Sequence, residues 1–323
     1  MRDRRRTGSG PTLAAAYDPR VPETRRGLLF GVAAYAMWGF FPLYWRLLEE
    51  TGALELLAAR VTFSLLVMVV LVLGLRKLER FRALVRDRRL RRLLTLAAVL
   101  ISVNWFVFIW GVNNERVLEI SLGYFITPLV SVLLGVVVLR ERLRRTQWAA
   151  TGLAVLAVVV LAIDYGRLPW VGVALALSFG FYGLLKKQAG VGAVESLAYE
   201  TLVILPVAVT YLIWLGAIGE ASYLDMGPGT MLLLVGSGLL TALPLLCFGG
   251  AATRVTLTTM GLLQYIAPTL QFLIGVLVFS EALPLSRLAG FVLVWTALVV
   301  FTVDAWRNHR RQLRLGALAS SAA

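Results

Sequence analysis

Ten long apolar segments, joined by short polar connections, set the strongest limit on what this chain can fold into. Each segment is close to the 17–25 residues that a helix needs to cross a bilayer. A lipid-exposed segment must satisfy its own backbone hydrogen bonds, which a helix does within one segment. The sequence therefore predicts an all-α membrane protein with ten transmembrane helices, over residues 28–45, 56–75, 93–112, 120–139, 147–163, 168–185, 197–215, 231–252, 257–279 and 286–303.

Composition favours lipid over water as the main solvent of this surface. Hydrophobic residues make up 59% of the chain and charged residues 15%, whereas soluble domains carry about 25% charged residues. The net charge of +14 raises the alternative of a nucleic-acid partner. Nucleic-acid-binding proteins gather their basic residues on one folded surface, but here these residues lie between apolar segments. We therefore expect a lipid bilayer and no nucleic acid around this chain.

The distribution of Lys and Arg predicts the orientation. If the N-terminus is cytoplasmic, 27 of the 32 basic residues fall on the cytoplasmic side and four on the other side. Short cytoplasmic connections of membrane proteins carry this excess of positive charge, so both termini are expected inside. Residues 1–26, rich in Arg, Gly and Pro, are expected to form a disordered basic tail without a signal peptide, and residues 305–323 a second basic cytoplasmic tail.

An internal repeat divides the membrane-spanning part in two. Residues 122–143 and 262–283 are identical at nine of 22 positions, and the shared residues include Pro128/Pro268 and Glu141/Glu281. The two stretches are the fourth and ninth predicted helices, so the repeat is five helices long. An odd number of helices turns the second copy upside down, which is the inverted 5+5 architecture of many secondary transporters. The expected units are 27–164 and 165–304; the alternative is a duplication retained for packing alone.

Two features of these helices point to a solute pathway. Pro128 and Pro268 are expected to break their helices, because proline removes an intrahelical hydrogen bond. Rings and amides near the bilayer midplane suit an amphiphilic organic solute, although ordinary packing is the alternative for each of them. The candidate pocket residues are Trp38, Asn104, Trp105, Tyr124, Tyr182, Gln264 and Tyr265.

Four ionisable residues in or near the membrane are costly there and invite a functional interpretation. Arg60 and Glu119 are predicted near the outer side, and Glu200 and Arg254 near the inner side, with Glu200 at the position of Arg60 shifted by 140 residues. We therefore hypothesise two charge pairs that act as outer and inner gates or bind a charged substrate. The alternative is that each pair only anchors helix ends near the headgroups.

Metal and nucleophile chemistry find little support in the sequence. The one cysteine, Cys247, lies within an apolar segment, and the one histidine, His309, lies in the C-terminal tail. A metal site or a histidine-based triad needs such residues in clusters. We expect no metal, no cofactor and no enzyme activity.

Several stretches resemble a known family. AAYAMWGFFPLY (33–44), NWFVFIWGVNN (104–114), LEISLGYFITPLVSVLLG (118–135), FGFYGLLKK (179–187), ALPLLCFGGAATR (242–254) and GLLQYIAPTLQFLIGV (261–276) are similar to EamA-type transporters of the drug/metabolite transporter superfamily, especially the RarD-like members. The resemblance covers residues 26–306. It implies ten helices in an inverted repeat, a central pocket and a multi-pass location in the bacterial plasma (inner) membrane.

The function expected from these observations is secondary transport, as an exporter or permease, of a small organic metabolite or amphiphilic drug by alternating access. No nucleotide-binding GxxxxGK[ST] motif is present, so a gradient would supply the energy, with protons as a candidate coupling ion and Glu200 before Glu119 as the coupling carboxylate. Two alternatives remain: an integral membrane enzyme acting on lipid or prenyl substrates, and a non-transporting membrane sensor or assembly partner.

Overall fold

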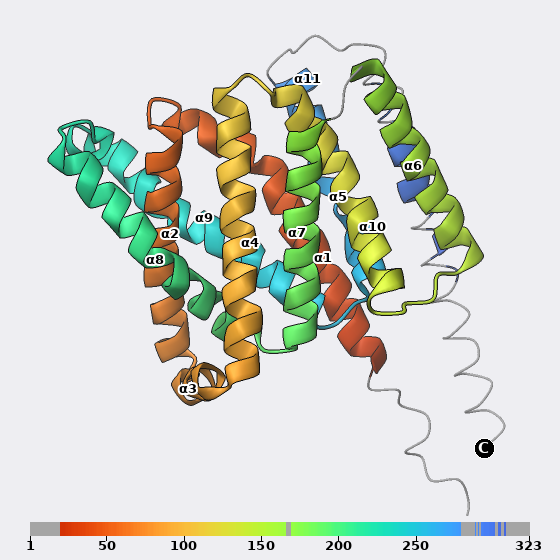
Figure 1. Cartoon of the computed structure of the whole chain (residues 1–323), viewed down its shortest axis with the longest axis horizontal. Coiled ribbons are helices and arrows are strands. Elements are labelled where there is room, and N and C mark those ends of the chain that lie inside the picture. Colours follow the sequence, from red (N-terminus) through yellow and green to blue (C-terminus); the bar gives the residue numbers. More distant parts are fainter. Residues whose placement is uncertain are drawn as a thin grey trace, which may run out of the picture.

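A computed structural model describes residues 20–165, 169–278, and 288, 290, 292–300, 303, 304 and 307. Within these ranges the chain is helical and contains no β-strand (Figure 1). The elements are α1 (Arg20–Trp45), η2 (Arg46–Leu48), α2 (Ala53–Gly74), α3 (Leu78–Arg86), α4 (Arg88–Asn113), α5 (Val117–Val137), α6 (Arg145–Tyr165), α7 (Trp170–Ala189), α8 (Ala193–Ala217), η3 (Ser222–Leu224), α9 (Pro228–Ala252), α10 (Leu257–Leu263) and α11 (Ile266–Leu277).

Apolar length makes this a multi-pass membrane protein. Seven stretches of the described residues are long and apolar enough to cross a bilayer, and Arg145–Val160 forms a shorter apolar helix. Large apolar side chains such as Leu66, Val70, Val207 and Leu232 are exposed on the outside of the bundle, as expected where lipid is the solvent. Residues 292–300, within the tenth predicted segment, are also helical. The count of ten helices and the orientation of the termini stay predictions.

The two ends of the chain lie mostly outside the described residues. α1 begins at Arg20, so the helix already includes the last residues of the predicted tail 1–26. In this first turn Glu23 pairs with Arg26 and Arg254, at 3.2 and 2.6 Å. These contacts order the stretch that composition alone assigned to the tail. Residues 1–19, and most of the predicted tail 305–323, fall outside the described part.

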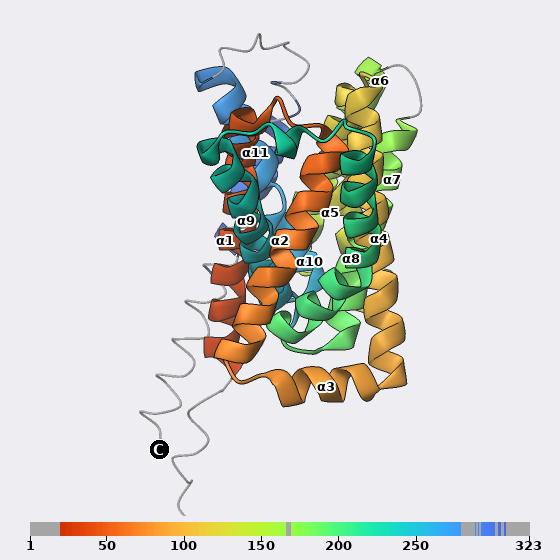
Figure 2. The same ribbon diagram turned by 90° about the vertical axis from the view of Figure 1, so that its left-hand side faces the viewer.

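A short amphipathic helix replaces the expected basic loop between the second and third predicted segments. α3 crosses one end of the bundle (Figure 2) and packs against α4 and α8. Its Leu84 is buried while its arginines face outward. Asp87 then caps α4, because its Oδ1 accepts hydrogen bonds from the amides of Arg89 and Leu90 at 2.8 and 3.0 Å.

The two repeat prolines affect their helices differently. The ninth predicted segment is interrupted at Gln264 and Tyr265, between α10 and α11. Pro268 has no N–H to offer the Gln264 carbonyl, which instead accepts from the Ala267 amide at 3.2 Å. Pro128, by contrast, lies inside α5, which continues as one helix. The break predicted at Pro128 is therefore not present in this structure.

Helix packing follows a pattern that matches the repeat. α1 packs against α9 and α11, and α7, which follows α1 by about 140 residues, packs against α4 and α5. α2 packs against α9, and α8 packs against α4. The contact of α1 with α9 therefore corresponds to that of α7 with α4, the contact of α1 with α11 to that of α7 with α5, and the contact of α2 with α9 to that of α8 with α4. α2 with α8, and α5 with α10, are contacts between counterparts themselves.

Small residues set how closely the helices approach where they cross. A Cβ atom on Gly238 of α9 would lie 2.4 Å from the carbonyl carbon of Phe63 on α2. At the same crossing the Ser64 hydroxyl donates to the Gly238 carbonyl at 2.9 Å. Close backbone approach at glycine is a main way in which membrane helices associate, and here it fixes α2 and α9 around the space described next.

Candidate functional site

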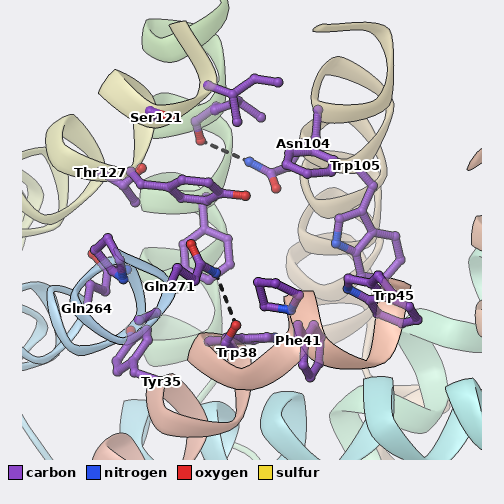
Figure 3. A pocket seen from close by; sticks show the side chains of 18 of the residues that line it. Tyr35, Trp38, Phe41, Trp45, Asn104, Trp105, Ser121, Thr127, Gln264 and Gln271 are labelled. Carbon is purple, nitrogen blue, oxygen red and sulfur yellow. Dashed lines mark hydrogen bonds between the residues drawn. The ribbon is translucent and has the colours of Figure 1, made fainter. Parts of the chain in front are cut away.

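A cavity of about 370 Å³ lies among α1, α2, α4, α5, α7, α9 and the α10–α11 pair. Figure 3 shows side chains of α1, α4 and α10–α11 projecting into a shared space. Its walls are aromatic or aliphatic, with a few hydroxyl and amide groups and one cation. The lining residues are Tyr35, Trp38, Phe41, Pro42, Trp45, Arg60, Ile101, Asn104, Trp105, Phe108, Val112, Ile120, Ser121, Tyr124, Thr127, Leu175, Phe179, Thr241, Leu245, Gln264, Ala267, Pro268 and Gln271.

The cavity occupies the half of the bundle away from α3. Trp45 is the last residue of α1, Val112 lies in the last turn of α4, and Ile120 lies in the first turn of α5. α4 starts directly after α3, so its last turn is at the opposite end of the bundle (Figure 2). The volume falls near the lower end of the range for small-molecule sites, about 300–1,000 Å³.

Arg60 on α2 provides the cation. Its Nε donates to the hydroxyl oxygen of Thr241 at 2.9 Å, and that hydroxyl donates onward to the Ser237 carbonyl at 2.8 Å. Its Cζ lies 4.5 Å from the ring centre of Trp45 and 5.7 Å from that of Trp105. Cation–π contacts of this kind contribute about 0.5–2 kcal/mol each, so two tryptophans and one hydroxyl hold the guanidinium in place.

Three amides stand around the cavity in fixed orientations. The Asn104 amide nitrogen donates to the Leu175 carbonyl and the Ser178 hydroxyl, both at 3.0 Å. The Gln271 amide nitrogen donates to the Trp38 carbonyl at 3.1 Å (Figure 3). Gln264, at the break between α10 and α11, accepts from the Ser131 hydroxyl at 3.2 Å.

Aromatic rings close the cavity toward the α3 end. Trp38 and Phe179 line the cavity, with ring centres 5.8 Å apart, and both pack against Phe248 at 5.9 and 5.3 Å. Behind them Tyr182 stacks on Phe248 at 5.5 Å with an interplanar angle of 17°. Tyr182 and Phe248 are fully buried, so this layer is a packed floor.

A buried charge network, formed by Tyr182, Lys186, Ser196 and Glu200, lies beneath this floor. Lys186 Nζ is 2.7 Å from Glu200 Oε1 and donates to the Ser196 hydroxyl at 2.6 Å. The Tyr182 hydroxyl donates to Glu200 Oε2 at 3.0 Å. The Lys186 and Glu200 side chains are each 2% exposed. The network joins α7 to α8 at the end of the bundle that α3 covers.

The hypothesis of two charge pairs is wrong in its partners. Glu119 pairs with Arg116 at 2.9 Å and accepts from the Val171 amide at 3.1 Å, so it faces α7. Arg60 instead contacts Thr241 and the tryptophans, and no carboxylate of the described residues lies within ion-pair distance of it. Two charges at one depth meet only if their helices also turn them toward each other, and a single sequence does not fix that rotation.

The inner pair is corrected for the same reason. Glu200 pairs with Lys186 rather than with Arg254. Arg254 lies at the end of α9, where it donates to Glu23 and to the Gly250 carbonyl at 2.9 Å. The sequence placed Lys186 among the cytoplasmic charges, yet it follows Tyr182 by four residues and so shares its helix face. The four-residue spacing of Tyr182 and Lys186 was the feature of the sequence from which their shared contact with Glu200 could have been predicted.

Of the seven predicted pocket residues, five line the cavity: Trp38, Asn104, Trp105, Tyr124 and Gln264. Tyr182 belongs to the buried charge network. Tyr265 is fully buried, and its hydroxyl donates to the Phe125 carbonyl of α5 at 3.2 Å. Both are packing residues next to the cavity, because neighbouring positions on a helix point in different directions, about 100° apart. Trp45 and Thr241, which hold Arg60, were not among the predicted pocket residues.

Among the described residues, no group of three or more His, Cys, Asp or Glu side chains is arranged to hold a metal ion. The groups that line the cavity are rings, amides, hydroxyls and one guanidinium, which can recognise a solute by stacking and hydrogen bonding. The membrane-crossing helices surround a cavity of solute size, which is lined by aromatic and polar side chains and closed by packed rings toward the α3 end. The class defined by this fold and site is a membrane protein with a central solute-sized site.

Comparison with known proteins identifies the family. Residues 25–163 match the model of the EamA-like transporter family. Protein RarD of Streptomyces exfoliatus is 55% identical over 92% of this chain and 95% of its own length. The uncharacterized transporter YojE of Bacillus subtilis is 44% identical over 87% and 94%, and protein RarD of Escherichia coli 43% over 90% and 98%. The chain belongs to the RarD group of the EamA family, in the drug/metabolite transporter superfamily.

The fold is shared with a solved crystal structure. It superposes with a TM-score of 0.67 over 87% of this chain and 98% of its own chain, at 19% sequence identity. At this identity the likeness concerns the arrangement of helices alone.

Proposed function

We propose that this protein is a secondary transporter that moves a small organic solute across the bacterial inner membrane by alternating access, with the central cavity as its substrate site. The single observation that carries this proposal is a solute-sized cavity, about 370 Å³, enclosed by the helices of both sequence repeats. Relatives that share most of their length with this chain are named as transporters, which supports a carrier over an enzyme.

The one-sided closure of the cavity supports alternating access. Aromatic rings and the buried charge network close the end that α3 covers, and the cavity lies toward the other end. The contacts of α1 and α2 with α9 and α11 have counterparts in those of α7 and α8 with α4 and α5. If each repeat adopts the packing that the other has here, the end of the bundle that is now closed opens and the opposite end closes. This is how inverted repeats support access from alternate sides of one fixed site. We therefore propose ten helices in two inverted repeats, with both termini cytoplasmic.

The break between α10 and α11 provides a hinge for this exchange. Gln264, Ala267, Pro268 and Gln271 line the cavity at the break, where Pro268 removes one backbone hydrogen bond from the helix. A helix interrupted beside a binding site can tilt its two halves separately, as the discontinuous helices of other transporters do. Its counterpart α5 is continuous in this state.

Glu200 is the proposed coupling carboxylate if protons drive the transport. Protonation removes the negative charge that pairs with Lys186 2.7 Å away, and this weakens the closed end. Glu200→Gln imitates the protonated form and should therefore abolish the pH dependence of flux. The matched control is Glu23→Gln, at an exposed pair outside the network. Flux that keeps its pH dependence in Glu200→Gln removes Glu200 from this role.

The experiment for the function itself is solute flux in liposomes. Purified protein is reconstituted into vesicles loaded with amino acids, metabolites and amphiphilic antibiotics, and solute loss is measured with and without a proton gradient. Ala267→Phe fills the cavity, whereas Val207→Phe adds the same ring on an outward face, where Val207 is 73% exposed. We expect selective efflux that Ala267→Phe abolishes and Val207→Phe preserves. Equal flux from empty and protein-containing vesicles, with folded protein, refutes the proposal.

A further inference from the structure

The cavity contains a charge whose sign limits what it can carry. Among the described residues that line it, Arg60 bears the one formal charge, and no Asp, Glu or Lys accompanies it. A cation within the bilayer is expensive, and in membrane proteins such a group usually pairs with an opposite charge or with backbone carbonyls. Here the described residues place no carboxylate within ion-pair distance of Arg60.

The contacts that hold Arg60 leave its charge in the cavity. Thr241 takes the Nε hydrogen at 2.9 Å, and the Trp45 ring covers one face of the guanidinium at 4.5 Å. Neither contact supplies a negative charge. The two terminal nitrogens of the guanidinium donate no hydrogen bond to a described residue, and they are the pair that binds a carboxylate with two parallel hydrogen bonds. Arg60 is therefore oriented as a receptor for an anion.

The rest of the lining fits the remainder of such a solute. Trp38, Trp45, Trp105, Phe108 and Phe179 supply broad apolar surfaces on which a flat ring can stack. The Asn104 amide nitrogen donates to Leu175 and Ser178, which leaves the carbonyl oxygen as the atom of this side chain that a solute can contact. A lining of aromatic rings, one cation and few amides favours a solute that is apolar except for one acidic group.

From this arrangement we propose that the cavity selects amphiphilic organic monoanions: a carboxylate bound by Arg60 and a ring-bearing body held between the tryptophans. Amphiphilic cations of the same shape are rejected by the Arg60 charge. This inference rests on the proposed transport function and names the class of its substrate. It makes Arg60 the residue that determines specificity.

The test compares three ligands that share one ring and differ in charge: indole-3-acetate (anion), indole-3-acetamide (neutral) and tryptamine (cation). Equilibrium binding of each to the full-length protein in lipid nanodiscs is measured for the wild type, Arg60→Lys and Arg60→Gln. The matched control is Arg26→Gln, an arginine that is 69% exposed and far from the cavity. Thermal unfolding of each variant confirms that it is folded.

We expect the wild type to bind the anion about 10- to 100-fold more tightly than the amide, as charge-assisted hydrogen bonds do, and the cation most weakly. Arg60→Gln should erase the preference, and Arg60→Lys should retain part of it because lysine cannot bind in bidentate fashion. Arg26→Gln should bind as the wild type does. The wild-type charge series needs no variant, so it stands even if Arg60→Gln does not fold.

Two results overturn the inference. One is wild-type binding of the amide or the cation at least as tight as that of the anion, and the other is binding of none of the three. In both cases the transport function is judged separately by flux of the broader solute panel. Flux of a neutral or cationic solute keeps the transporter and discards the anion class, whereas absence of all flux discards the transporter.

Discussion

Lys186→Met is the variant whose effect on stability follows most directly from the structure. Lys186 and Glu200 are each 2% exposed and lie 2.7 Å apart, and Lys186 also donates to Ser196 at 2.6 Å. Methionine fills a similar volume but has neither the charge nor the donors. The variant therefore leaves the Glu200 carboxylate buried, with the Tyr182 hydroxyl, at 3.0 Å, as its remaining hydrogen-bond donor among the described residues.

Removing one partner of a buried ion pair costs about 3–5 kcal/mol, because the other charge stays buried without compensation. Protonation of Glu200 and the bond from Tyr182 both reduce this cost, so we expect the free energy of unfolding to fall by about 3 kcal/mol. Replacing both partners by apolar residues is often neutral or stabilising. The double variant Lys186→Met/Glu200→Met should therefore recover at least about 2 kcal/mol of the loss.

The assay is equilibrium chemical unfolding in mixed lipid–detergent micelles, followed by tryptophan fluorescence. The control is Arg26→Met, which breaks the exposed pair with Glu23, where the two side chains are 69% and 46% exposed. Exposed pairs contribute less than about 1 kcal/mol. Equal effects of Lys186→Met and Arg26→Met, or a double variant no more stable than Lys186→Met, would refute the buried network as a closing element.

Two further changes test how the helices are held together. Gly238→Ala puts a methyl group 2.4 Å from the Phe63 carbonyl carbon, so it should lower the free energy of unfolding by about 1–3 kcal/mol. The control is Gly229→Ala, whose methyl group meets nothing within 4 Å and which should leave the free energy of unfolding unchanged. Equal stability of the two variants contradicts the close crossing of α2 and α9. The Glu141 carboxylate accepts hydrogen bonds from the amides at the start of α10 at 2.7 and 2.9 Å. Glu141→Gln removes its charge, so the free energy of unfolding should fall by about 1 kcal/mol, measured by thermal unfolding. An unchanged midpoint contradicts the role of Glu141 as a helix cap.

Membrane-crossing segments could be predicted from the sequence because their length and apolarity are set by the bilayer rather than by tertiary contacts. Apart from α3, the helices from α1 to α9 coincide with predicted segments within a few residues at most ends. α3 was missed because its basic residues obscure the apolar face that carries Leu84. The break before Pro268 was expected, but proline alone does not decide between a break and a continuous helix, as Pro128 shows.

The candidate site was predicted from the depth of residues in the membrane, and depth does not fix the direction in which a side chain points. Trp38 and Asn104 lie inside α1 and α4, Gln264 lies at the break between α10 and α11, and all three line the cavity. Tyr265 directly follows Gln264, yet it faces α5. Neighbouring residues on a helix point about 100° apart, so a choice between them needs the positions of the surrounding helices. For the same reason, depth placed Arg60 near Glu119 while packing turned them apart.

The most direct measurement of alternating access is two-sided labelling of the cavity. In a Cys247→Ser background, which removes the one native cysteine, Ala267→Cys places a single thiol in the lining. A membrane-impermeant maleimide is applied from one side or the other of oriented vesicles, with and without transported solute. Alternating access through this cavity predicts labelling from both sides, with solute shifting the balance between them. Labelling confined to one side, while solute flux continues, would contradict it.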